Sequence, residues 1–95
     1  PEAKQVMIDW SLDEDFWLRR IAIDHQLLQK EKTDIVLLEK ILVNNLNQTE
    51  FFITKAIGWS LRDYSKTNPH WVRDFLGKYQ HQMASLSIRE ASKYL

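Results

Sequence analysis

Four residues in the segment FFITKAIGWSLRDYSKTNP (51–69) have the types and the spacing to contact a nucleic acid. Lys55, Trp59, Arg62 and Lys66 recur at i, i+4, i+7 and i+11, which places three cations and one indole along a single stripe of a helix. Lysine and arginine neutralise phosphates, and an indole offers a flat face to a base or a sugar. A cation above such a face gains about 0.5–2 kcal/mol.

The same stripe also has an ordinary structural interpretation. On a helix over 50–66, the opposite face carries a set of apolar and small residues that would occupy the core: Ile53, Ile57, Ser60, Leu61 and Tyr64. Trp59 is then left towards the polar side, where the cations could simply be solvated while the indole packs on a neighbouring helix. Gly58 costs the helix roughly 0.5–1 kcal/mol relative to alanine, which indicates that something approaches the backbone there. Both interpretations remain open on the stripe alone.

Composition limits the class of protein. The chain has 95 residues, 44% of them hydrophobic, so it can form one compact core. Its formal net charge is zero, so attraction to nucleic acid needs basic residues segregated on one face. The absence of cysteine excludes disulfides and thiolate-bound metals. No apolar run approaches the roughly 20 residues of a membrane span. The chain begins at Pro1 rather than at methionine, and we expect it to be a fragment of a longer protein.

The sequence predicts six helices and no strands, so the expected class is all-α. Asn68 followed by Pro69 is an N-cap with proline at the first helical position. The pairs Thr33-Asp34 and Thr49-Glu50 mark two further helix starts, and Ser87 with Glu90 matches a capping box. The expected helices lie near residues 2–10, 14–30, 34–46, 50–66, 69–80 and 87–95.

The chain also repeats every 35 residues. Apolar residues recur at this interval in three series: Phe16, Phe51 and Leu86; Leu18, Ile53 and Ile88; Val6, Ile41 and Leu76. A helical hairpin that repeats in this way buries its apolar side only by stacking on its neighbours. The period is near that of tetratricopeptide repeats, but their motif is absent. We therefore expect a HEAT-like α-α solenoid, a right-handed superhelix of about two and a half hairpins, with repeat units near 1–32, 33–67 and 68–95. On this pattern the aromatic pairs at 16–17 and 51–52 are predicted to be core.

The repeat relates the stripe to the preceding hairpin. Position 20 corresponds to 55 and 90, and position 24 corresponds to 59 and 94. Arg20 and Lys55 should therefore point the same way from equivalent helices, roughly 8–10 Å apart. That is close enough to follow the phosphates of one strand, which favours nucleic-acid contact.

Three segments resemble the bacterial AlkD-like DNA alkylation repair family, the HEAT-like-repeat DNA glycosylases: DFWLRRIAI (15–23), EFFITKAIGWSLRDYSKTNP (50–69) and SLSIREASKYL (85–95). The resemblance covers essentially the whole chain and corresponds to the C-terminal repeats of that family. It implies removal of N3- and N7-alkylated purines from double-stranded DNA, without a metal or other cofactor, by a protein that is monomeric when intact and acts in the bacterial cytoplasm.

The resemblance also implies roles for individual residues. Trp59 would be an aromatic wall beside the lesion, and Arg20 would grip the DNA backbone; Lys55, Arg62 and Lys66 are added as DNA-binding candidates from the stripe. The catalytic aspartate of the family lies in a tryptophan-rich motif upstream of these repeats and has no counterpart here. Trp10 and Asp13 align with a turn between repeats and are not matched to it.

Two further features complete the analysis. The segment IDHQL (23–27) departs from the family, which is apolar there; Asp24 is expected to pair with Arg20 one turn earlier. The histidines at 25, 70 and 81 lack metal-binding spacing. The alternative function is a non-catalytic HEAT-like module that binds DNA or a protein.

Overall fold

The computed structural model describes residues 2–95, and within them it contains six α-helices and no strand. The predicted all-α class is confirmed. The helices are α1 (Glu2–Trp10), α2 (Phe16–Asp24), α3 (Ile35–Val43), α4 (Phe51–Ser65), α5 (Pro69–Tyr79) and α6 (Ser85–Ala91), with 3-10 turns at Lys30–Lys32 and Gln80–Gln82. Across residues 2–95, none of the helices has the length and apolar character needed to cross a bilayer.

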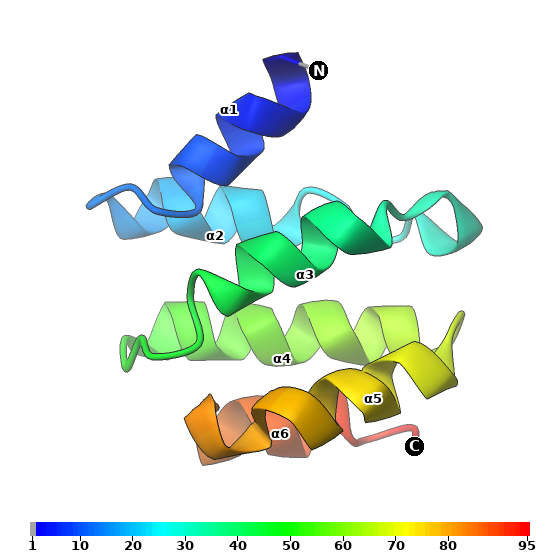
Figure 1. The fold of residues 1–95 in the computed structure, drawn as a ribbon. Coiled ribbons are helices and arrows are strands. Elements are labelled where there is room, and N and C mark those ends of the chain that lie inside the picture. The colour runs from blue at the N-terminus through cyan, green and yellow to red at the C-terminus, as the bar shows by residue number, and fades with distance from the viewer. Residues whose placement is uncertain (1) are drawn as a thin grey trace.

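The helices pair into successive hairpins that form two layers. Helices α3 and α5 lie in front of α2, α4 and α6 in Figure 1. Helix α4 contacts α2 on one side and α6 on the other, and it also contacts α5 in the front layer. The even-numbered helices therefore run side by side along one layer.

Hydrogen bonds join points of neighbouring hairpins that are one repeat apart. Asn45 Nδ2 donates to the carbonyl oxygen of Ser11 at 3.0 Å, 34 positions away. Ser87 Oγ donates to the carbonyl of Thr54 at 2.6 Å, 33 positions away, and the amide of Leu28 donates to the carboxylate of residue 63 at 2.9 Å, 35 positions away. These contacts therefore join parts of the chain separated by about the interval at which apolar residues recur in the sequence.

Helix starts follow the cap signals of the sequence. The side chain of Asp34 accepts from the amide of Leu37, and that of Asn68 accepts from the amide of Trp71, as predicted. Each of these bonds satisfies one of the backbone donors that a helix start leaves unpaired. The helix-start predictions at these two positions are confirmed.

The core lies between the layers and is built largely on α4. The five residues predicted to occupy its inner face are all buried: Ile53, Ile57, Ser60, Leu61 and Tyr64. Tyr64 meets Trp71 edge-to-face with ring centroids 5.5 Å apart, and Trp71 meets Phe75 at 5.5 Å. Such pairs add about 0.5–1.5 kcal/mol beyond the burial of their area, so the Tyr64–Trp71 pair fastens α5 to α4.

The helix predicted over 14–30 is too long. It ends at Asp24, and the chain then turns through Leu28 and Lys30, whose φ angles are 67° and 52°. The bond from the Leu28 amide to Asp63 Oδ2 is formed in this turn. Left-handed backbone conformations are usually adopted by glycine. This segment contains no glycine, so nothing in its sequence marked the end of the helix at Asp24.

The predicted capping box at Ser87 and Glu90 is wrong. Helix α6 begins two residues earlier, after Ala84, whose side chain makes no cap. Ser87 is buried and its hydroxyl bonds to α4, while Glu90 pairs with Arg62. Tertiary contacts thus use both side chains that the local pattern assigned to the helix start.

Candidate nucleic-acid interface

A groove runs between α2 and α4, and its deeper part contains three of the predicted site residues. This part has a volume of about 240 Å³, and its lining includes Arg20, Lys55 and Trp59. The side chain of Arg20 is 41% exposed and Trp59 is 43% exposed. Equivalent helices of two hairpins therefore bring a guanidinium, an ammonium and an indole to one solvent-accessible surface, as the 35-residue repeat predicted.

Trp59 lies between two cations of its own helix. The Nζ atom of Lys55, one turn earlier, lies 5.2 Å from the centre of the indole, and the Cζ atom of Arg62 lies 4.7 Å from it. Both distances fall within the range of cation–π attraction. These contacts hold a large aromatic side chain in a defined place at the surface.

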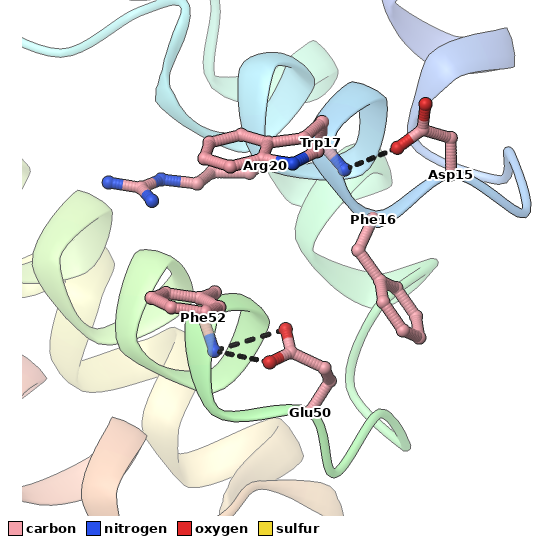
Figure 2. Close-up of a pocket in the computed structure, with 6 residues that line it drawn as sticks. All are labelled: Asp15, Phe16, Trp17, Arg20, Glu50 and Phe52. Atoms are coloured by element: carbon pink, nitrogen blue, oxygen red, sulfur yellow. Dashed lines mark hydrogen bonds between the residues drawn. The ribbon is translucent and has the colours of Figure 1, made fainter.

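The groove continues towards the first turns of α2 and α4, where it has a volume of about 320 Å³. Figure 2 shows that the rings of Trp17 and Phe52 come from opposite helices, with Arg20 extending beside them. The guanidinium carbon of Arg20 lies 5.7 Å from the centre of the Trp17 ring and 5.8 Å from that of Phe52. Trp17 and Phe52 thus hold Arg20, whose side chain lines both parts of the groove.

The expectation that the aromatic pairs at 16–17 and 51–52 are core is wrong. Phe16, Trp17, Phe51 and Phe52 are 46%, 66%, 54% and 53% exposed, respectively. Adjacent residues on a helix point about 100° apart, so two neighbouring aromatics cannot both face the core. A sequence signal existed, because Phe52 lies three residues before Lys55, and this spacing places it on the same stripe.

The remaining stripe residues turn towards α6. Arg62 Nη1 lies 3.0 Å from Glu90 Oε1, and both side chains are less than a quarter exposed. Lys66 Nζ lies 5.0 Å from the centre of the Tyr94 ring. The stripe is therefore divided: Lys55 and Trp59 line the groove with Arg20, whereas Arg62 and Lys66 contact the C-terminal hairpin.

The carboxylates that line the groove all have partners. Asp15 and Glu50 accept hydrogen bonds from the amides of Trp17 and Phe52 at the helix starts. Asp24 Oδ2 lies 3.5 Å from Arg20 Nε, which confirms the predicted ion pair. Burial raises the pKa of Asp24, and the charge of Arg20 acts against this rise. The groove is thus built to hold cations and aromatic faces in place.

Residues 11–15 connect α1 to α2, as expected for the turn that contains Asp13. The Oδ1 atom of Asp13 accepts from the amide of Asp15, and its carbonyl accepts from the side chain of Arg19. Asp13 therefore organises the turn before α2.

Comparison with known proteins gives this geometry its context. The whole chain, residues 1–95, matches the family described as DNA alkylation repair enzyme. A solved structure described as a predicted DNA alkylation repair enzyme from Enterococcus faecalis is 46% identical, with a TM-score of 0.90. The match covers 99% of this chain and 43% of that one. No curated protein matched. The chain belongs to the DNA alkylation repair enzyme family.

Proposed function

We propose that the intact protein is a DNA glycosylase that excises N3- and N7-alkylated purines, and that this part of it grips the DNA and supplies an aromatic wall. The proposal is carried by one observation: Arg20, Lys55 and Trp59 share a groove between adjacent helices. Membership of a DNA alkylation repair family implies that the substrate is DNA. In this proposal residues 1–95 are the C-terminal part of a single HEAT-like-repeat domain, acting as a monomer in the bacterial cytoplasm.

The chemistry of the lesion suits such a groove. Alkylation at N3 or N7 leaves the purine positively charged, so cleavage of the glycosidic bond releases a neutral base and leaves an oxocarbenium-like sugar. Preorganised charges and π-faces stabilise the charge that develops on that sugar. Trp59 would provide such a face, while Arg20 and Lys55 would bind the flanking phosphates. Lys66 would extend this contact towards α6.

The residue that activates water is proposed to lie outside this chain. Asp15, Asp24 and Glu50 line the groove, but each is already held by a helix start or by Arg20. The family resemblance implies a catalytic aspartate upstream of these repeats, with no counterpart in this sequence. We therefore expect residues 1–95 alone to bind DNA without releasing a base.

The test is to replace Trp59 or Arg20 with alanine in the intact protein. Release of N7-methylguanine and N3-methyladenine from methylated duplex should slow by on the order of 10- to 100-fold, the size of effect expected when a positioning group is lost. Lys78→Met is the control, because Lys78 pairs with Glu39 on the other layer. Wild-type rates in both groove variants would refute the proposal.

A non-catalytic module that binds DNA or a protein is the second candidate. The partnered carboxylates of the groove favour it for this part of the chain, because each hydrogen bond or ion pair helps to fix the binding surface. Absence of base release by the intact wild-type protein, together with duplex binding, would select this alternative.

A further inference from the structure

Helix α6 approaches α4 very closely at Gly58. A Cβ atom added to Gly58 would lie 2.8 Å from the Cβ of Glu90 and 3.2 Å from the Cα of Ser87. The buried hydroxyl of Ser87 donates to the carbonyl oxygen of Thr54 at 2.6 Å, one turn earlier on α4. The position of α6 along α4 is therefore fixed at two neighbouring points.

This fixed position presents the carboxylate of Glu90 to Arg62. Their 3.0 Å contact joins side chains that are only 23% and 21% exposed, so it is less screened than a pair in open water. The guanidinium of Arg62 also lies 4.7 Å from the centre of the Trp59 indole. One planar cation thus contacts a carboxylate of α6 and the aromatic wall of the groove.

Arg62 and Arg20 differ in what they can offer to DNA. Arg20 lines the groove and its side chain is 41% exposed, whereas that of Arg62 is 21% exposed and is neutralised by a carboxylate 3.0 Å away. A charge-assisted hydrogen bond is stronger than a neutral one, and here it ties one end of the planar guanidinium to α6. Lys55 makes the other cation contact with the indole. Its ammonium group sits on a flexible side chain and has no plane to align with the ring.

We propose that Glu90 is a positioning residue: through Arg62 it holds the indole of Trp59 in the groove, and Arg62 acts on that indole rather than on a phosphate. Its effect on base release rests on the proposed glycosylase function. The arrangement of the three side chains is independent of that function.

The first test replaces Glu90 with glutamine in the intact protein. Single-turnover release of N7-methylguanine should slow by on the order of tenfold, as for a small displacement of a positioned group, while affinity for duplex DNA stays at the wild-type value. The indole N–H resonance of Trp59, assigned with Trp59→Phe, should shift. Loss of affinity together with a shallower salt dependence in Arg62→Met would instead make Arg62 a phosphate ligand and overturn the proposal.

A charge exchange separates positioning from simple stabilisation. The double variant Arg62→Glu with Glu90→Arg can restore an ion pair between α4 and α6, but it removes the guanidinium from position 62 beside the indole. We expect this double variant to be more stable than either single variant and close to the wild type, while base release and the Trp59 resonance remain altered. Recovery of all three would show that the pair only stabilises the fold.

The outcomes also distinguish this proposal from the proposed function. If the wild-type protein releases no base but Glu90→Gln still shifts the Trp59 resonance, the glycosylase function fails and the positioning role stands. If the wild type is active and Glu90→Gln changes neither rate nor resonance, the positioning role fails. Glu39→Gln is the matched control, because Glu39 bonds to Tyr79 and Lys78 on α5, away from the groove.

Discussion

The three cations of the stripe look equivalent in the sequence, but the structure places them in different surroundings. Lys55 lines the groove, whereas Arg62 is paired with a carboxylate and Lys66 contacts the ring of Tyr94. Helical spacing predicted that all of them share a face, which is correct. It could not predict the partners of Arg62 and Lys66, because these come from α6 and from the residues that follow it.

The ion pair between Lys4 and Asp34 gives a prediction on pH. The 2.6 Å contact with Lys4 is the main cause that holds the pKa of Asp34 below its ordinary value of 3.8. The hydrogen bond from the backbone amide of Leu37 is the second cause. A carboxyl whose pKa is lower in the folded state stabilises the fold above its unfolded pKa, and this contribution disappears as the pH falls through the folded pKa. Asp34→Asn, which keeps a cap acceptor, should be less stable than wild type at neutral pH and should lose less stability on acidification.

Denaturant unfolding across acidic and neutral pH measures this difference. Lys4→Met should also reduce the acid-dependent loss of stability, and the double variant should change little beyond either single one, because the two side chains form one interaction. An unchanged pH profile in Lys4→Met would contradict the assignment.

At the scale of the elements, α4 connects the fold to the site. Its inner face is buried, its outer face carries Trp59 and Lys55, and Gly58 between them admits α6. The sequence predicted this helix, its core face and the need for a close approach at Gly58. It did not predict where α2 ends, because the left-handed residue at the turn is Leu28 rather than glycine.

The two glycines of the chain make a matched pair. Gly58→Ala places a methyl group 2.8 Å from the Cβ of Glu90, so it should destabilise the protein by about 1–3 kcal/mol, the usual cost of overpacking. Gly77→Ala meets nothing within 4 Å and should stabilise α5 by roughly 0.5–1 kcal/mol. Urea unfolding of both variants tests the prediction, and equal stabilities would contradict the close contact between α4 and α6.

At the scale of the whole molecule, a chain of zero net charge places Arg20 and Lys55 beside exposed aromatic rings. The 35-residue repeat was enough to predict that Arg20 and Lys55 lie on one surface. Apart from Trp59, the aromatic lining was not predicted, because a repeating Phe or Trp resembles a core position unless the face it shares with the cations is considered. Trp17 and Phe52 are the residues for which this distinction matters.

Salt dependence tests the proposed DNA surface as a unit. If Arg20, Lys55 and Lys66 each neutralise one phosphate, log affinity for duplex should fall with log salt at a slope of roughly −2.7, since each contact contributes about −0.9. Arg20→Met in the intact protein should reduce the slope by about 0.9. Lys78→Met should leave it unchanged, and a flat response in the wild type would favour a protein partner.

The bond between the Leu28 amide and Asp63 makes the connection after α2 part of the architecture of the groove. Surface connections usually accept insertions with little effect, but this one is tied to the far end of α4. The bond therefore ties the residues after α2 to the C-terminal turn of α4. Loss of the Asp63 carboxylate would therefore release this connection from α4 without any change in the residues that line the groove.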